Sequence, residues 1–239
     1  MIRIGNVAVG MRTRRARTIR NGTTAWRTDL IESPVEQAPS PQAYIVEQSP
    51  HQQLDPHFHL QDQFQVIVGG GGRIGSHEVR PYFVHYASGH TGYGPIVAGP
   101  GGLSYMTLRL NTEFGALYLP ESRPRMRAVK RRNIHANIVP APDAAGERPA
   151  LAMAIPAQDN GAAAWHLRLA PMGRHRPAPA AGNRFYLVMR GGMLAQGEEL
   201  AAHSCVFVSA DDAQWEVQAG KQGLEALVLR FDAGSAPAA

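Results

Sequence analysis

Short apolar runs, separated by polar residues, glycine and proline, follow one another along most of the chain. Runs of this length, rich in aliphatic and aromatic residues, predict β-strands rather than helices. They lie at 43–47, 56–68, 80–87, 103–110, 151–155, 164–169, 184–190, 205–208, 214–217 and 224–231. Residues 1 to about 42 are interrupted by glycine and by a proline-rich stretch, which predicts an irregular lead-in. The glycine-rich segment Gly69–Gly75 predicts a turn-rich link between strands.

The pattern of the first half recurs in the second half at a constant offset. Residues 43–111 align without a gap with residues 164–232, an offset of 121 positions, and fourteen aligned residues are identical. The identities include glycines of turns as well as residues of strands, such as Phe64 and Phe185. Turn and strand residues that match in one register favour two copies of one β-unit over chance agreement.

The sequence therefore predicts an all-β chain of two tandem small antiparallel units with a short helical or irregular connector. The predicted parts are an N-terminal unit at 1–120 with its core at 43–111, a connector at 121–160, and a C-terminal unit at 161–239 with its core at 164–232. The connector begins with a basic stretch and continues with many prolines and alanines. Its stretch Glu121–Arg132 can form one basic helix, because proline is tolerated in a first helical turn.

Composition and charge narrow the class of protein. With 44% hydrophobic and 18% charged residues, the chain has the balance of a globular protein and not of a disordered one. The lone cysteine, Cys205, cannot form an internal disulfide, and no apolar run approaches the length of a membrane span, so we expect a cytoplasmic protein. The net charge of +5 comes largely from basic residues within 12–20 and 123–132. Because no nucleic-acid-binding motif accompanies them, we interpret both stretches as solvated surface.

Two histidines stand one residue apart in the extended stretch 56–68. Side chains alternate along a strand, so His57 and His59 point to the same side and their imidazoles can converge on one ion. The alternative is a strand whose polar side, formed by the odd-numbered residues from 57 to 65, faces solvent. A turn at Leu60–Asp62 would instead restart the alternation after the pair.

The repeat provides an internal control for these histidines. At the same offset, alanine replaces both members of the pair, at positions 178 and 180, and Val206 replaces His85. The second copy is thus expected to build the same unit without these polar groups. A role other than folding would explain their presence in the first copy.

Together with two later residues, the pair resembles the first motif of the cupin superfamily, written G-x5-H-x-H-x3-E-x6-G. In this chain the motif is formed by His57, His59, Gln63 and Gly70. Gln63 stands where the family usually has a glutamate, which removes an anionic group from the motif.

The second cupin motif, G-x5-P-x-G-x2-H-x3-N, is present only in part. Gly75 and Pro81 fit its start, whereas Phe83 replaces its second glycine and Tyr86 occupies its histidine position, one residue after His85. Through the repeat, the resemblance covers both predicted cores. The chain therefore resembles a bicupin, two small barrels of the double-stranded β-helix type, with a second barrel that lacks the metal-ligand positions.

The resemblance implies a divalent metal, Fe, Mn, Ni, Zn or Cu, inside the N-terminal barrel, where imidazoles suit these ions. Its ligands would be His57, His59, Gln63 and His85. The glutamine in place of glutamate should weaken the binding or change the preferred metal. His90, in a glycine-rich loop, is the substitute for His85 as third histidine.

Three residues are candidates for contacts with a substrate: Gln65, His90 and Tyr93. The implied function is that of a metal-dependent enzyme, dioxygenase-like or isomerase-like, acting on a small organic molecule. The alternative is a non-catalytic protein that binds or senses a small metabolite in the same pocket, a hypothesis favoured by the missing acidic ligand. Because sheet edges are commonly protected by pairing, we also expect a homodimer.

Overall fold

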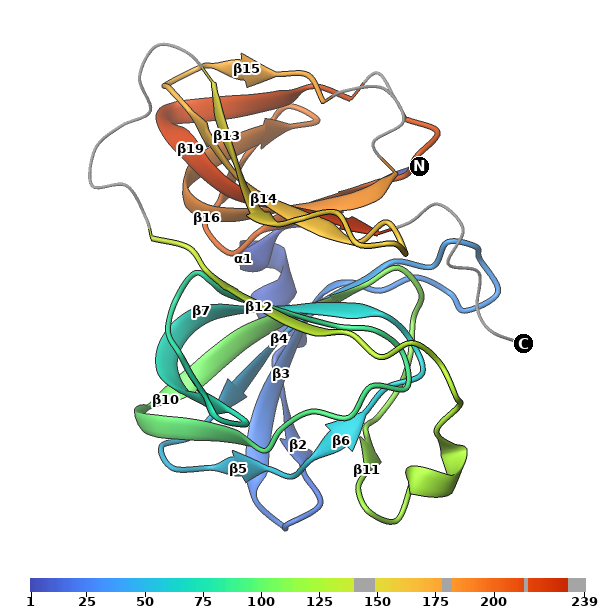
Figure 1. The fold of residues 1–239 in the computed structure, drawn as a ribbon. Coiled ribbons are helices and arrows are strands. Elements are labelled where there is room, and N and C mark those ends of the chain that lie inside the picture. The colour runs from blue at the N-terminus through green and yellow to red at the C-terminus, as the bar shows by residue number, and fades with distance from the viewer. Residues whose placement is uncertain (140–148, 178–181, 213–214, 232–239) are drawn as a thin grey trace. The chain divides into compact units, whose positions relative to one another are not determined.

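The computed structural model describes residues 1–139, 149–177, 182–212 and 215–231. The chain forms two compact units built of antiparallel strands, which confirms the predicted all-β fold (Figure 1). The N-terminal unit is Met11–Asn137, and the C-terminal unit combines Met1–Gly10 with Ile138–Ala239. No helix in the described part of the chain is long and apolar enough to cross a membrane.

The N-terminal unit has one large sheet with the strand order β12-β9-β7-β10-β4-β3-β2. Its strands are β2 (Arg15–Thr18), β3 (Thr24–Ile31), β4 (Gln42–Gln48), β7 (Gln63–Ile74), β9 (Phe83–Ala87), β10 (Ile96–Arg109) and β12 (Asn133–Asn137). Smaller elements are η1 (Met11–Thr13), β5 (Gln53–Leu54), β6 (His57–Phe58), β8 (His77–Val79), β11 (Leu117–Tyr118) and η2 (Arg123–Arg125). The long central strands bury an apolar cluster that includes Ile67, Phe83, Ile96 and Tyr105.

The C-terminal unit has a sheet with the order β1-β18-β16-β19-β14-β13. Its strands are β1 (Ile2–Gly5), β13 (Ala150–Ile155), β14 (Ala163–Leu169), β16 (Asn183–Ala195), β18 (Cys205–Val208) and β19 (Val217–Phe231). Smaller elements are α1 (Val7–Gly10), β15 (Arg174–His175) and β17 (Glu198–Ala201). Within the described residues, the path of paired strands returns to its first strand in neither unit, so we describe open antiparallel sheets and not closed barrels.

The repeat in the sequence is also a repeat in strand pairing. In the N-terminal unit Phe64 lies opposite Leu108, and in the C-terminal unit Phe185 lies opposite Leu229, each residue shifted by 121 positions. The same shift relates the pair of Gly70 and Leu103 to the pair of Gly191 and Leu224. The two units therefore share one strand register at their centres.

Three predictions about the ends of the units were wrong. The first residues are not irregular, because β1 pairs with β18 and joins the C-terminal unit. The basic stretch Glu121–Arg132 forms only the short 3-10 turn η2 instead of a helix, since it has no apolar face to pack against a sheet. The strand that follows it, β12, pairs with β9 and extends the N-terminal sheet beyond the predicted boundary at residue 120.

Of the glycines predicted as a turn-rich link, Gly69–Gly72 lie instead inside the long strand β7, and only Gly75 lies in a turn. Gly70 has a positive φ of 66°, and a Cβ at this position would overlap the carbonyl oxygen of Gly102 on β10. The equivalent Gly191 has a φ of 71°, and its Cβ would overlap the carbonyl oxygen of Gly223. Glycine is thus needed in both units where the two central strands approach each other closely.

We expect Gly70→Ala to destabilise the N-terminal unit. A left-handed backbone costs alanine about 1–2 kcal/mol, and relief of the overlap adds to it, so the free energy of unfolding should fall by at least about 2 kcal/mol. Urea unfolding followed by circular dichroism measures the change. Gly101→Ala is the matched control, because no atom of the described residues, its chain neighbours apart, lies within 4 Å of its Cβ position. Equal stability of both variants would contradict the packing argument.

Candidate functional site

The predicted polar residues are buried inside the N-terminal unit. His57 is 1% exposed, Gln63 1% and His85 0%, and His59 and Gln65 are also buried. The strand β6 ends at Phe58 and β7 begins at Gln63, so a turn interrupts the alternation between them. The alternative of a solvent-facing polar strand is therefore wrong.

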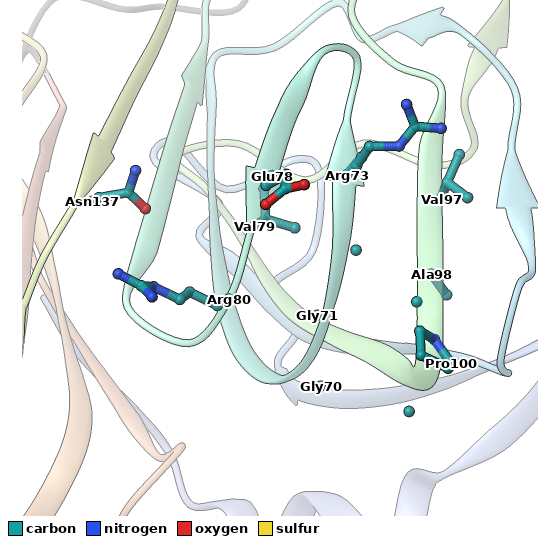
Figure 2. Close-up of a pocket in the computed structure, with 13 residues that line it drawn as sticks. Gly70, Gly71, Arg73, Glu78, Val79, Arg80, Val97, Ala98, Pro100 and Asn137 are labelled. Carbon is teal, nitrogen blue, oxygen red and sulfur yellow. The ribbon is translucent and has the colours of Figure 1, made fainter.

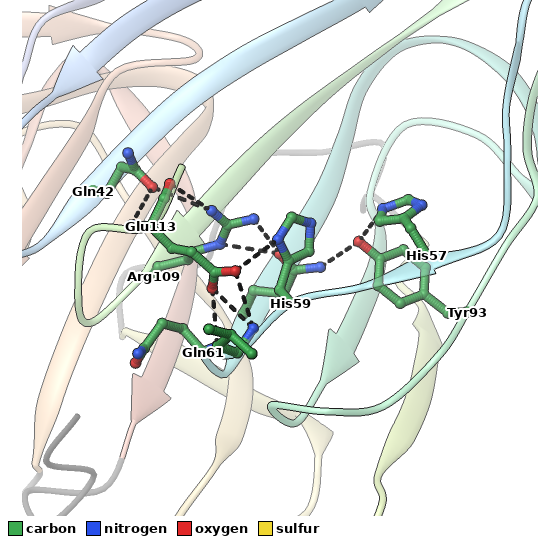
Figure 3. Close-up of polar contacts among 9 residues, drawn as sticks. Gln42, His57, His59, Gln61, Tyr93, Arg109 and Glu113 are labelled. Carbon is green, nitrogen blue, oxygen red and sulfur yellow. Dashed lines mark hydrogen bonds and ion pairs between the residues drawn. The ribbon is translucent and has the colours of Figure 1, made fainter. Parts of the chain in front are cut away.

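Six side chains in this interior form what we call the polar cluster: His57, His59, Gln63, Tyr93, Arg109 and Glu113 (Figure 3). Arg109 lies on β10 directly opposite Gln63 and is 1% exposed. Its Nε and Nη2 donate to Gln63 Oε1 at 3.2 and 2.9 Å. Its Nη1 donates to Gln42 Oε1 at 3.3 Å and to the Glu113 carbonyl at 3.1 Å. A buried cation thus fixes the orientation of the Gln63 amide.

A chain of hydrogen bonds with one direction runs from Arg109 through Gln63 and Tyr93 to His57. Because Gln63 Oε1 accepts from Arg109, its Nε2 donates to the Tyr93 hydroxyl at 2.5 Å. His57 Nδ1 is 2.8 Å from the Asp55 carbonyl, which can only accept, so Nδ1 carries the hydrogen. Burial, against the hydrogen bond to Asp55, lowers the pKa of His57 to about 4 and keeps it neutral. Its Nε2 therefore accepts from the Tyr93 hydroxyl at 2.8 Å. We call this chain the relay.

The second histidine lies beside a carboxylate. His59 Nδ1 is 3.4 Å from Glu113 Oε1 and makes no hydrogen bond with a described residue. Burial, with a smaller effect of Arg109, lowers the pKa of His59 to about 3 despite this carboxylate. Glu113 accepts from the backbone N–H groups of Leu60 and Gln61 at 3.0 and 2.9 Å. Although burial opposes it, the contact with His59 keeps the pKa of Glu113 low, so the carboxylate is charged beside a neutral imidazole.

His85 lies close to Tyr93, with ring centroids 4.8 Å apart, but its nitrogens are turned to amides. Nδ1 is 2.9 Å from Gln65 Oε1 and Nε2 is 2.7 Å from Asn133 Oδ1. Burial and His135, stacked at 5.0 Å, lower the pKa of His85 to about 3. A neutral imidazole has one N–H, so one of the two amides must present its NH2 group. The predicted substrate residue Gln65 thus holds His85 in place.

His90 lies outside the polar cluster. The imidazole Nδ1 of His90 accepts a hydrogen bond from the backbone N–H of Arg127 at 3.3 Å. The backbone N–H of His90 donates to the His59 carbonyl at 2.7 Å. These bonds link the glycine-rich loop to neighbouring segments. Tyr93, predicted to contact a substrate, places its hydroxyl inside the cluster and also lines a surface pocket.

A larger pocket of about 830 Å³ lies over the glycines of β7 and β10 (Figure 2). Its charged lining residues, Arg73, Glu78 and Arg80, are exposed. Gly70 and Gly72 in its lining are explained by the close approach of the strands, since a Cβ on Gly72 would overlap the Val97 carbonyl. No buried polar side chain of the described residues lines it, so we place the candidate site at the polar cluster.

The predicted metal ligands, as arranged, do not fit a divalent ion. Within the described residues, no group of three or more His, Cys, Asp or Glu side chains is placed to hold a metal. The Nε2 of His57 is occupied by Tyr93, and both nitrogens of His85 are occupied by amides. The buried guanidinium of Arg109, hydrogen-bonded to Gln63, would repel a cation at short range.

Sequence reasoning did not single out Arg109, Glu113 or Asn133. Arg109 was visible as a member of the repeat, matched by Arg230, and that identity on an apolar strand was a signal for a buried charge. Glu113 follows β10 in a loop and Asn133 opens β12, and no local pattern marks either position. Ala178 and Ala180, the repeat equivalents of His57 and His59, lie outside the described residues. Val206, the equivalent of His85, is buried and pairs with Tyr186, just as His85 pairs with Gln65.

No protein-family model and no curated protein matches the chain. Its structure is similar to that of a candidate dioxygenase from Nostoc punctiforme, with a TM-score of 0.66 and 12% identity over 99% of this chain and 85% of that one. It is also similar to the pirin YhhW from Escherichia coli in complex with nickel(II), with a TM-score of 0.57 and 12% identity over 97% and 99% of the two chains.

A third similar structure is a cupin 2 conserved barrel domain protein from Leptotrichia buccalis, with a TM-score of 0.53 and 10% identity over 87% and 89% of the two chains. At this level of identity the similarities show the fold alone. They agree with the antiparallel sheets described above. The chain therefore shares its fold with these three proteins, one of which is a cupin.

Proposed function

We propose that the chain is a bicupin whose N-terminal unit binds a small polar organic molecule at the polar cluster, without a divalent metal on the four predicted ligands. The observation that supports this is the Tyr93 hydroxyl, which sits between His57 Nε2 and Gln63 Nε2. In the cupin motif that this chain resembles, the side chains at the positions of His57 and Gln63 would both face the metal. Here they already have a hydrogen-bonding partner from the protein itself.

The cluster offers a defined set of contacts to a ligand. A ligand hydroxyl that displaced the Tyr93 hydroxyl would accept from Gln63 Nε2 and donate to His57 Nε2. Arg109 would stabilise negative charge on the ligand through Gln63, in an interior where electrostatic interactions are strong. The C-terminal unit has Val206 and the buried Arg184 at the positions of His85 and Gln63, so we assign it a role as scaffold.

A second candidate function, that of a metal-dependent enzyme, is favoured by one observation. The buried Nδ1 of His59 makes no hydrogen bond with a described residue and faces the Glu113 carboxylate. With His57 released from Tyr93, these side chains would hold a divalent ion. Such an ion would act as a Lewis acid toward a substrate oxygen. The similar pirin structure is a complex with nickel(II).

Metal analysis separates the two candidates. The protein is equilibrated with Fe²⁺, Mn²⁺, Ni²⁺ or Zn²⁺ at pH 7, gel-filtered and analysed for bound metal. We expect less than stoichiometric metal, unchanged in the His57→Ala/His59→Ala double variant. Near-stoichiometric metal that is lost in a folded double variant would overturn our proposal and establish the metal site.

The relay itself predicts the effect of Tyr93→Phe. Removal of the hydroxyl leaves His57 Nε2 and Gln63 Nε2 without this partner in a buried site, which costs about 1–3 kcal/mol per group. The free energy of unfolding in urea should fall by that amount or more. Tyr105→Phe is the control, because Tyr105 is a buried tyrosine whose hydroxyl is outside the relay. Equal losses in the two variants would argue against the relay.

A further inference from the structure

A pocket of about 370 Å³ lies next to the polar cluster, and Tyr93 belongs to both. The pocket is lined by Pro56, Gly92, Tyr93, Gly94, Leu119, Arg123, Met126 and Arg131. We infer that this pocket binds the carboxylate of a small organic acid, with Arg123 and Arg131 as its anion-binding residues. The inference rests on the proposed function, because it assigns the chemical class of the molecule that the N-terminal unit binds.

The charge of the pocket is positive and uncompensated. Arg123 and Arg131 are its only charged lining residues, and neither guanidinium forms an ion pair with a described residue. A neighbouring arginine shows the contrast, since Arg20 forms an ion pair with Glu121 at 2.6 Å. Two guanidinium groups without a carboxylate partner create a positive potential that attracts an anion. Arginine also binds carboxylates through two parallel hydrogen bonds.

The arginines are carried by a segment that is fixed against the site. The N–H of Leu119 donates to the Pro56 carbonyl at 2.9 Å, just before the turn η2. The N–H of Arg132 donates to Ser88 Oγ at 2.9 Å, just after the pocket residue Arg131. Between these anchors, the N–H of Met126 donates to the Arg123 carbonyl at 3.0 Å. The basic segment is therefore part of the pocket wall and not a free surface tail.

Backbone hydrogen bonds between Tyr93 and His57 join the pocket wall to the relay. The N–H of Tyr93 donates to the His57 carbonyl at 3.0 Å, and the N–H of His57 donates to the Tyr93 carbonyl at 3.1 Å. A molecule in the pocket would thus contact the residue whose hydroxyl bonds to His57 Nε2. Leu119 and Met126 offer it apolar contacts. This combination suits an organic acid with a hydroxyl group and an apolar body better than an inorganic anion.

Calorimetric titration with two matched probes tests the inference. Mandelate has a carboxylate, a hydroxyl and an aromatic ring, and mandelamide replaces the carboxylate by a neutral amide. In 20 mM salt, where screening is weak, we expect wild-type protein to bind mandelate on the order of tenfold more tightly than mandelamide. The Arg123→Gln/Arg131→Gln variant should lose this preference and keep its affinity for mandelamide.

The control is Arg17→Gln/Arg125→Gln, which removes the same charge from exposed positions that do not line the pocket. It should keep the preference for mandelate. Equal binding of both probes by wild-type protein, or an unchanged preference in Arg123→Gln/Arg131→Gln, would overturn the anion inference and leave the proposed function intact. Binding of neither probe would overturn the proposed function together with the inference.

Discussion

Acidification from pH 7 to pH 5 is expected to unfold the N-terminal unit. Burial lowers the pKa of His57 to about 4, and the pKa values of His59 and His85 to about 3, from 6.5 in an unfolded chain. Below pH 6.5 the unfolded state therefore binds more protons than the folded state, and the stability falls with falling pH. At pH 5 each histidine costs roughly 2 kcal/mol, and the three together roughly 6 kcal/mol. This is comparable to the whole stability of a small domain, about 5–15 kcal/mol.

Urea unfolding at pH 7, 6 and 5 measures this dependence. His85→Gln keeps an amide between Gln65 and Asn133 and removes one titrating group. As the pH falls, the stability of this variant should therefore decrease less steeply than that of the wild type. His51→Gln, at an exposed position, should follow the wild type. A wild-type stability that stays constant down to pH 5 would show that these imidazoles are not buried in the neutral form.

Arg109→Ala is expected to destabilise the N-terminal unit by about 3 kcal/mol or more, because each buried acceptor that loses its donor costs about 1–3 kcal/mol. The substitution leaves Gln63 Oε1 and the Glu113 carbonyl without the donors that Arg109 provides, and leaves Gln42 Oε1 with the N–H of Glu113 at 3.4 Å. It also removes the cation that orients Gln63 toward Tyr93. Arg109→Lys should recover only part of the loss, because an ammonium group cannot reproduce the planar fork of a guanidinium. The free energy of unfolding in urea measures both effects.

The repeat supplies a matched control for this substitution. Arg230 occupies the equivalent position on β19, is only partly buried, and donates from Nε to the Gly161 carbonyl at 2.8 Å. Arg230→Ala should therefore cost about 1 kcal/mol, as for a single hydrogen bond. Similar losses in the two variants would indicate that position 109 matters through packing and not through its hydrogen bonds.

Local patterns in the sequence predicted much of the fold. The strand at 205–208 matches β18, and the strands at 43–47 and 164–169 lie within β4 and β14. The offset of 121 positions predicted the shared register of the central strands, because a repeated pattern of strands and glycines folds in the same way twice. The histidine pair and Gln63 were assigned to one interior, where the structure places them.

The tertiary structure alone decided which side chains meet His57. Along the end of β10, Thr107 and Arg109 are as buried as Met106 and Leu108, so alternation does not mark an inward-facing charge. The position of Arg109 opposite Gln63 depends on strand pairing, and that of Tyr93 on a loop between distant strands. The sequence by itself thus determined the strands, the repeat and the histidines. Long-range pairing, which no local pattern encodes, decided that a tyrosine and an arginine complete their site.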